Sequence, residues 1–429
     1  MAYIEIQGGK PLSGRITISG NKNALLPMVC GSLLTSEPIE ITNVPKISDG
    51  LKILKMFQDI GSDVVQDDNS MNIHHSGDIS EINSSLIPVG IRSAVLLFAP
   101  IIYRTGRFEF DQDAKGCALG IREIDPHLEV LKSFGCDIAY NGQKCVITCL
   151  DGFKGGSVWL DYQSVTATET FLMAAVVAKG TSKLTNAACE PHVKSFCDYL
   201  TSMGAKISGV GTSILTVEGV DKLSGANIRV PDDHHEAATY AAIGASTGGI
   251  LNIETHISSE MELIVRQFQK VGLNVSITET GLVTGPSSFR VQKNFTPEAI
   301  TKVEAAPWPY FPADILPQII GASIQSEGEI LFWNKVYEGA LFWSSELQKF
   351  GSRVHLSDPH RLLMIGSGQL RPATVEAPYI IRVVLGLVIA ALQIPGESVV
   401  KKADPIARAH PDFIEKLQSL GADIRWVEE

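Results

Sequence analysis

The hydrophobic pattern of the chain repeats six times. Each repeat has an almost wholly apolar segment, a polar turn, a short segment of alternating residues, and an amphipathic segment that ends at a glycine. The apolar segments predict helices buried on all sides, and the amphipathic segments predict helices with one exposed face. The predicted buried helices cover residues 23–34, 92–102, 167–178, 236–246, 313–324 and 380–392.

A glycine closes each amphipathic segment and leads into an alternating segment that is typical of a strand. Glycine readily adopts the left-handed conformation that often follows the last turn of a helix. The spacing of 68 to 79 residues is longer than the repeats of linear solenoids, so it favours nested units of helices and strands. These glycines are Gly61, Gly135, Gly204, Gly272, Gly351 and Gly421.

Six fully buried helices cannot share one small core, so the pattern predicts two domains of three units each. The predicted fold class is α/β, with two inside-out α/β domains that each contain three repeated βαβαββ-like units around buried helices. We expect one domain at residues 22–229, which contains Cys117, and a second at residues 1–21 plus 230–429, which contains Asp314. A length of 429 residues is sufficient for two such cores.

Composition narrows the class of protein. The net charge of −11 argues against nucleic acid as a partner, because phosphate backbones attract basic surfaces. The N-terminus shows no signal peptide, and the most apolar late segment, residues 379–396, is interrupted by Arg382 and short for a bilayer. Seven scattered cysteines suggest reduced thiols. We therefore expect a cytoplasmic protein with no membrane partner; the oligomeric state stays open.

Polar and charged residues lie where the predicted buried helices begin. A helix N-terminus has unpaired N–H groups and a positive dipole end, so it suits an anion. Serine, threonine and aspartate are also ordinary capping residues there. A lysine or arginine opposes the dipole and therefore indicates a nearby anion. The residues concerned are Lys22, Asn23, Arg92, Ser164, Thr166, His234, Glu236, Asp314 and Glu376.

Two groups leave several chemistries open. His234, His235 and Glu236 are metal-ligand types, but adjacent histidines rarely bind one ion and no further ligand pattern accompanies them, so we expect no metal site. Cys117 stands in "AKGCALGIREID", a loop of small residues with Arg122 five positions on. By itself this stretch is compatible with a nucleophile, an acid, a metal ligand or a structural thiol.

Four stretches resemble the enolpyruvyl transferases: "GNKNALLPMVCGSLLTSEPIEITNVPKISD", "GIRSAVLL", "GCALGIREIDPH" and "PYFPADILPQ". The resemblance runs along the whole chain and keeps the six-unit plan. It implies two domains that close over a cleft, where the enolpyruvyl group of phosphoenolpyruvate passes to a sugar 3-hydroxyl and phosphate is released. Phosphoenolpyruvate is then a co-substrate, the partners are small anionic molecules, and no cofactor is expected.

The resemblance implies roles for individual residues toward phosphoenolpyruvate. Lys22, Arg122 and Arg408 would hold its phosphate and carboxylate, and Lys335 would be a further substrate-binding cation. Guanidinium groups suit both anions because they donate two parallel hydrogen bonds. Cys117 would protonate phosphoenolpyruvate or capture it covalently, and would be the target of fosfomycin.

The resemblance also implies an acceptor side. Asn23 and Arg92 would contact the sugar, and Asp314 would accept the hydroxyl proton. The nucleotide would contact Arg122, Asp125, Ser164, Val165 and Thr166.

The chain departs from the family pattern at several positions. At the sixth buried helix the family has an aspartate and, two residues later, an arginine; the alignment places Val375 and Ala377 there. Lys335 replaces one arginine, and His234 is the nearest equivalent of another. Residues on the acceptor side also differ, namely Leu96, Glu123 and Pro126.

Three hypotheses follow. The leading one is transfer to UDP-N-acetylglucosamine, the first committed step of peptidoglycan precursor synthesis. The altered acceptor side favours a second, with another nucleotide such as a nucleoside monophosphate as the acceptor. The missing arginine at Ala377 favours a third, a non-catalytic paralogue that binds a nucleotide sugar, although the retained Cys117 and Asp314 argue against it.

Overall fold

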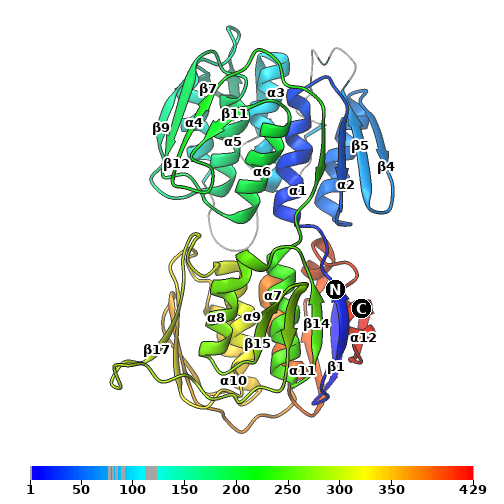
Figure 1. Ribbon diagram of the computed structural model, residues 1–429, viewed down its shortest axis with the longest axis vertical. Helices are drawn as coiled ribbons and strands as arrows, with labels where there is room; N and C mark the ends of the chain where they lie inside the picture. Colours follow the sequence, from blue (N-terminus) through cyan, green and yellow to red (C-terminus); the bar gives the residue numbers. More distant parts are fainter. Residues whose placement is uncertain are drawn as a thin grey trace. The chain divides into compact units, whose positions relative to one another are not determined.

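The computed structural model describes residues 2–75, 79, 82, 86–87, 92–111, 123–142 and 144–428, and these divide into two compact units (Figure 1). The first unit holds residues 20–111 and 123–231, and the second holds residues 2–19 and 232–428. Each unit has its own hydrophobic core. The chain passes between the units at residues 19–20 and 231–232.

Three buried helices form the centre of the first unit. They are α1 (Lys22–Gly31), α3 (Phe98–Thr105), which continues the 3₁₀ helix η3 (Arg92–Leu97), and α5 (Val165–Ala175). Every residue of α1 from Ala24 onward and every residue of α5 from Ala167 onward is buried. The prediction of helices apolar on all sides is confirmed.

The second unit repeats this plan. Its buried helices are α7 (His234–Thr247), α9 (Leu316–Ala322), which follows the 3₁₀ helix η5 (Ala313–Ile315), and α11 (Ile381–Leu392). Helices α9 and α11 pack very closely. A Cβ atom on Gly321 would lie 2.1 Å from the carbonyl oxygen of Gly386, so this packing requires glycine.

Three sheets surround the buried helices of the first unit. Each contains the antiparallel strands of one repeat, and two gain a parallel strand: β13 beside β3, and β9 beside β10. The sheet orders are β13-β3-β5-β4, β6-β8-β7 and β11-β12-β10-β9. The strands are β3 (Ile39–Thr42), β4 (Asp63–Gln66), β5 (Ser70–His74), β6 (Arg107–Asp111), β7 (Asp137–Asn141), β8 (Lys144–Thr148), β9 (Ser157–Trp159), β10 (Thr181–Thr185), β11 (Lys206–Ser208), β12 (Ile214–Glu218) and β13 (Ala226–Arg229).

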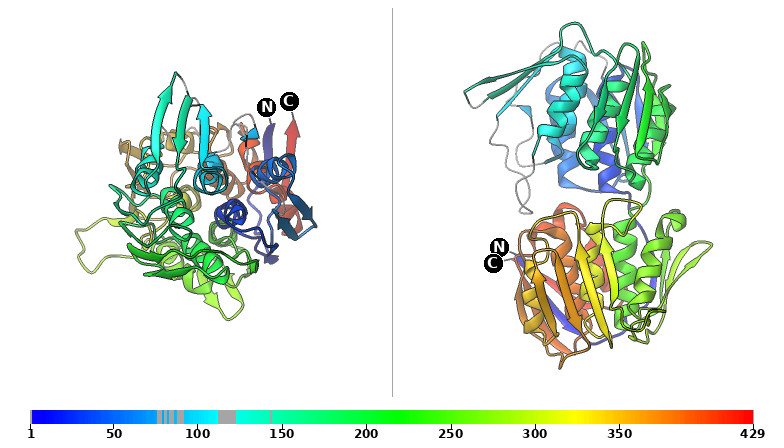
Figure 2. Two further views of the ribbon diagram at one scale, coloured as in Figure 1. Left: turned by 90° about the horizontal axis from the view of Figure 1, so that it is seen from above. Right: turned by 90° about the vertical axis from the view of Figure 1, so that its left-hand side faces the viewer.

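The N-terminal segment completes two of the three sheets of the second unit. Strand β2 pairs in parallel with β14, and β1 pairs antiparallel with both β22 and β23, so the two ends of the chain lie side by side (Figure 2). The sheet orders are β15-β16-β14-β2, β17-β18-β20-β19 and β21-β22-β1-β23. The strands are β1 (Ala2–Gly8), β2 (Gly14–Thr17), β14 (Leu251–Glu254), β15 (Val275–Thr278), β16 (Gly281–Thr284), β17 (Thr301–Ala305), β18 (Glu329–Asn334), β19 (Val354–Asp358), β20 (Arg361–Ile365), β21 (Thr374–Glu376), β22 (Gly396–Lys401) and β23 (Asp423–Glu428).

Six amphipathic helices lie between the sheets. All six predicted glycines follow them with φ angles between +87° and +101°, the left-handed region in which glycine avoids the strain of a side chain. The helices are α2 (Ser48–Asp59), α4 (Asp125–Ser133), α6 (Pro191–Ser202), α8 (Glu262–Lys270), α10 (Ser345–Lys349) and α12 (Phe413–Ser419). Within the described parts of the chain, no helix has the length and apolarity that crossing a membrane requires.

A buried ion pair fixes the point where the N-terminal segment leaves the second unit. Glu236 accepts hydrogen bonds from Lys416 Nζ and from the backbone N–H of Ser19, both at 2.7 Å. Lys416 also donates to Ser19 Oγ at 2.7 Å. Burial by itself lowers the pKa of Lys416, but the charges of Glu236 and Asp412 outweigh this effect and raise the pKa.

Breaking this pair is expected to destabilise the second unit strongly. Lys416→Met leaves the Glu236 carboxylate buried without its cation, which costs about 3–5 kcal/mol of the free energy of unfolding. Adding Glu236→Gln to Lys416→Met should recover part of the loss. The control is Lys55→Met, which removes an exposed pair with Asp59 and should cost less than about 0.5 kcal/mol. Urea unfolding of the four proteins is the measurement; an equal effect of Lys416→Met and Lys55→Met contradicts the prediction.

His75 is a buried structural histidine of the first unit. Its Nε2 lies 2.9 Å from Ser32 Oγ and its Nδ1 lies 2.7 Å from Ser62 Oγ. Burial, helped by the charges of Arg104 and His74, lowers the pKa of His75 to about 3. The folded chain therefore keeps this imidazole neutral at a pH at which the unfolded chain protonates it.

This difference predicts a loss of stability in acid. Between about pH 6.5 and pH 3 the unfolded state binds one more proton at His75, so the free energy of unfolding falls by about 1.4 kcal/mol per pH unit as pH decreases. His75→Gln should remove that part of the slope in urea unfolding between pH 7 and pH 5. A matched change of the exposed His355 to Gln should leave the slope in place. If the free energy of unfolding of His75→Gln changes with pH as steeply as that of the unaltered chain, His75 is not buried in its neutral form.

Candidate active site

Lys22 begins α1 and forms an ion pair with Asp49. Its Nζ lies 2.7 Å from Oδ2 of Asp49, and the two side chains are only 18% and 6% exposed. Asp49 lies in the first turn of α2, where the helix dipole favours a negative charge. The anion that a lysine needs at a helix N-terminus is thus supplied in part by the chain itself, and a bound phosphate would share Lys22 with Asp49.

The starts of α4 and α5 lie against each other in the first unit. Ser164 is the N-cap of α5, and its Oγ accepts a hydrogen bond from the N–H of Ala167 at 3.3 Å. Val165 and Thr166 are the first two helical residues, and Thr166 Oγ lies 3.1 Å from Nε2 of His127. Asp125, which is exposed, begins α4 two residues before His127. Four of the five candidate nucleotide contacts, Asp125, Ser164, Val165 and Thr166, therefore occupy two connected helix starts.

Several predicted residues have no described side chain. Cys117 and Arg122 lie outside the described residues, and of Arg92 only the backbone, at the start of η3, is described. Asn23, the second residue of α1, is half-buried. Leu96, expected on the acceptor side, is 2% exposed and belongs to the hydrophobic core of the first unit.

Asp314, Arg382 and His410 lie together in the second unit. Asp314 is in η5, immediately before α9, and its Oδ2 lies 3.7 Å from Nε of Arg382 in the first turn of α11. Nη1 of Arg382 lies 3.3 Å from Nε2 of His410. Burial and the charge of Arg382 lower the pKa of His410 to about 3, so this imidazole is neutral and its Nε2 accepts from the guanidinium. His410 thus holds Arg382 beside the candidate base without adding charge.

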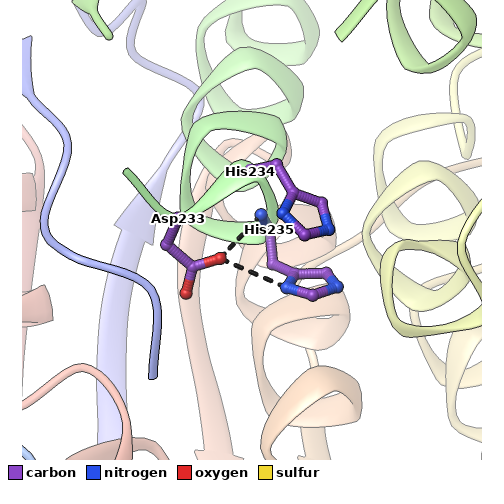
Figure 3. A group of neighbouring side chains, drawn as sticks. All are labelled: Asp233, His234 and His235. Atoms are coloured by element: carbon purple, nitrogen blue, oxygen red, sulfur yellow. Dashed lines mark hydrogen bonds and ion pairs between the residues drawn. The ribbon is translucent and has the colours of Figure 1, made fainter. Parts of the chain in front are cut away.

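Asp233 connects α7 to the same group. It is the N-cap of α7, and its Oδ1 accepts from the backbone N–H of His235 at 2.8 Å and lies 3.2 Å from Nδ1 of that residue (Figure 3). Burial alone raises the pKa of Asp233, but the hydrogen bond and charge of His235, with Arg382 and His234, hold it well below its usual range. The starts of α7, α9 and α11 therefore share one charged network.

Asp233, His234 and His235 are also the described residues that could hold a metal ion, because one ligand atom of each lies within 4.8 Å of the others. Their geometry fits a helix cap better. Oδ1 of Asp233 already receives two contacts from His235, and the two imidazole rings lie against each other, with their centroids 3.9 Å apart and their planes tilted by 35° (Figure 3). The positive charge of Arg382 further opposes a cation. The absence of a metal site stays a prediction.

The remaining predicted cations of the second unit are Lys335 and Arg408. Lys335 follows β18; its Nζ lies 2.7 Å from Oε2 of Glu304 and 4.3 Å from the ring centre of Trp333. Its charge is therefore compensated within the chain. Arg408 is half-buried at the end of the 3₁₀ helix η7 (Asp404–Arg408), two residues before His410.

The structure places the two departures before the sixth buried helix in the hydrophobic core. Val375 lies in β21 and Ala377 directly follows it; both are core residues, 0% and 1% exposed. Helix α11 begins only at Ile381, so the charged residue in its first turn is Arg382. Sequence reasoning missed this residue, although a signal existed: a single arginine interrupts the start of an otherwise apolar helix, as at Arg92.

The six described cysteines are all buried. They are Cys30, Cys136, Cys145, Cys149, Cys189 and Cys197. Burial raises the pKa of every one of these thiols, that of Cys197 to about 12, so few of them ionise near neutral pH. Because the thiolate is the reactive form, these cysteines are poor nucleophiles in the folded chain.

We therefore expect native labelling to single out Cys117. Iodoacetamide at pH 7.5 should modify one cysteine of the folded protein, Cys117, and all seven after unfolding in urea. Peptide mass spectrometry identifies the site, and Cys117→Ser is the matched control that should take no label when folded. Early labelling of any of the six buried cysteines would contradict the prediction.

Comparison with known proteins shows which family this sequence is similar to. Residues 6–417 match the family described as EPSP synthase (3-phosphoshikimate 1-carboxyvinyltransferase). The UDP-N-acetylglucosamine 1-carboxyvinyltransferase of Borreliella burgdorferi is 35% identical, over 100% of this chain and 99% of the relative. The protein of the same name from Treponema denticola is also 35% identical, over 99% of each chain.

Solved structures show the same fold. The enolpyruvyl transferase NikO from Streptomyces tendae superposes with a TM-score of 0.86 at 22% identity, over 99% of both chains. EPSP synthase from Acinetobacter baumannii superposes with a TM-score of 0.77 at 17% identity, over 100% of both chains. The predicted inside-out α/β architecture is confirmed.

Proposed function

The chain belongs to the EPSP synthase family of enolpyruvyl transferases, and from this premise we propose its reaction. It transfers the enolpyruvyl group of phosphoenolpyruvate to the 3-hydroxyl of UDP-N-acetylglucosamine and releases phosphate. The observation that carries the choice of acceptor is the full-length similarity, at 33–35% identity, to relatives named for this reaction. The product is the first committed precursor of peptidoglycan.

Binding of the two substrates must depend on local cations. Both substrates are anionic, whereas the chain carries a net charge of −11. We assign the phosphate and carboxylate of phosphoenolpyruvate to Lys22, Arg122 and Arg408, with Lys335 as a further contact. The pairing of Lys22 with Asp49 and of Lys335 with Glu304 holds each lysine in place before a substrate arrives.

Asp314 and Cys117 are assigned to the proton transfers. Asp314 takes the proton of the 3-hydroxyl while the hydroxyl oxygen forms a bond to C2 of phosphoenolpyruvate, and an acid adds a proton to C3. Cys117 supplies that proton; in the alternative, its thiol adds across the double bond, with sulfur on C2 and the proton on C3, and the C2–S bond breaks again before the hydroxyl oxygen attacks C2. Departure of phosphate from C2 with loss of a proton from C3 then restores the double bond. No cofactor is needed, because phosphoenolpyruvate carries both the transferred group and the leaving group.

Arg382 joins these assignments as the arginine of the sixth unit. It lies 3.7 Å from Asp314 and is held by His410. A guanidinium in this position can bind a carboxylate or phosphate through two hydrogen bonds while it orients Asp314. The hypothesis of a non-catalytic paralogue rested on the missing arginine at Ala377. Because Arg382 supplies an arginine in the sixth unit, we do not favour that hypothesis.

The acceptor side is assigned to Asn23, Arg92, Asp125 and the start of α5. Asn23 and Arg92 are proposed to contact the sugar, and Asp125, Arg122 and residues 164–166 the nucleotide. The exposed backbone N–H groups at the start of a helix suit the phosphates or carbonyls of a nucleotide.

The decisive test is phosphate release from phosphoenolpyruvate in the presence of UDP-N-acetylglucosamine. We expect turnover with the unaltered chain. Asp314→Asn should lower kcat by about 10²–10⁴-fold with little change in melting temperature, because the base is lost and the fold is kept. Arg382→Lys keeps the charge but loses the paired hydrogen bonds, so kcat/KM should fall by at least about tenfold.

The controls separate the acceptors. Lys55→Met, on the exposed face of α2, should leave turnover unchanged. Nucleoside monophosphates replace UDP-N-acetylglucosamine in a parallel assay. Phosphate release with a nucleoside monophosphate and none with UDP-N-acetylglucosamine would overturn the proposed acceptor, and no release with either would overturn the proposed reaction.

A further inference from the structure

His127 forms a bridge between two helices of the first unit. Its side chain is buried, 1% exposed, in the first turn of α4. Nδ1 lies 2.8 Å from Oγ of Thr170 and Nε2 lies 3.1 Å from Oγ of Thr166. The two threonines are four residues apart, so they lie one turn apart on the same face of α5. Both ring nitrogens therefore contact α5.

A third element packs against the same imidazole. Phe98, the first residue of α3, places its ring edge-on to His127 at a centroid distance of 6.3 Å. Helix α3 continues η3 directly, and η3 begins at Arg92. Three of the segments that carry candidate sugar and nucleotide contacts of this unit, namely η3–α3, α4 and α5, therefore meet at one side chain.

The opposite side of the α5 start is held separately. Thr168 Oγ donates to the carbonyl of Ser164 at 2.8 Å and accepts from the backbone N–H of Ala188 at 3.0 Å. These bonds tie α5 to the segment after β10, and they do not involve α4. His127 and its two threonines form a hydrogen-bonded link between the starts of α4 and α5.

We propose that His127 is a positioning residue that sets the distance between Asp125 and the Ser164–Thr166 backbone, and through it the affinity for the nucleotide part of the acceptor. This inference rests on the proposed function. A neutral imidazole donates from one nitrogen and accepts at the other, so it matches two hydroxyl groups at once and leaves neither ring nitrogen without a partner in the core. Of the two threonines in this bridge, Thr166 is itself a candidate nucleotide contact.

The test is steady-state kinetics with each substrate varied in turn. His127→Ala should raise KM for UDP-N-acetylglucosamine by about 10–100-fold, since displacements of about 1 Å in a binding site have effects of this size. KM for phosphoenolpyruvate and kcat at saturating acceptor should change less than about threefold, a split that general loss of stability would not produce. Thr166→Val, which removes one hydroxyl and keeps the backbone, should raise the same KM, and it serves if His127→Ala does not fold.

Two conservative changes add a rescue test. The amide of His127→Gln can reach the position of Nε2 and contact Thr166. The KM of this variant for the acceptor should therefore be close to that of the unaltered chain and well below that of His127→Ala. The shorter His127→Asn reaches only the position of Nδ1 and should not. Ser133→Ala, in the last turn of α4, is the matched control and should leave all constants unchanged.

The outcomes separate this inference from the proposed function. If the unaltered chain turns over UDP-N-acetylglucosamine but His127→Ala and Thr166→Val leave its KM unchanged, or raise both substrate KM values equally, the positioning role is wrong and the function stands. If the unaltered chain neither binds nor turns over UDP-N-acetylglucosamine, the proposed acceptor falls and the positioning role falls with it. A rise confined to the acceptor KM, reversed by Gln, supports the role.

Discussion

The constraint on which this structure depends is the burial of six helices along most of their length. Such a helix satisfies its internal hydrogen bonds but leaves the first N–H groups unpaired, and burial makes each unpaired group costly. The chain meets this need with polar side chains at the helix starts, such as Asn21 on α1, Ser164 on α5 and Asp233 on α7. Polar chemistry is therefore concentrated at one end of each apolar core.

Charge compensation follows the same rule inside each unit. Lys22 is paired with Asp49 in the first unit, and Arg382 acts on Asp233, Asp314 and His410 in the second. A cation at a helix start is unfavourable alone, and Lys22 and Arg382 each have a carboxylate partner. These partners orient the cations, which prepares them for an anionic substrate. The proposed substrates thus meet sites whose charges are already arranged.

The repeated pattern made most of the fold predictable. The six apolar runs and the six glycines correspond to observed helices and left-handed residues, because both signals are local: side-chain periodicity reports burial, and glycine reports backbone conformation. The candidate site was less predictable. Lys22, Asp314 and Ser164 were found from their places at helix starts, but Asp49, Glu304 and His410 were not, because nothing in the sequence says which side chain a cation will contact. Arg382 was not predicted as a site residue, because the charged positions of the family pattern fall at Val375 and Ala377, before the helix that carries Arg382.

The sequence by itself determined the number of units, the burial of their central helices, the turns that end the outer helices, and the resemblance that names the family. Only the tertiary structure decided which distant segments complete each sheet and which side chains share a charge. Strand β1 pairs with β23, and His127 meets Thr166 and Thr170, across separations that no local pattern encodes. The physical reason is that periodicity and conformational preference act over a few residues, whereas pairing between distant groups is selected by packing of the whole core.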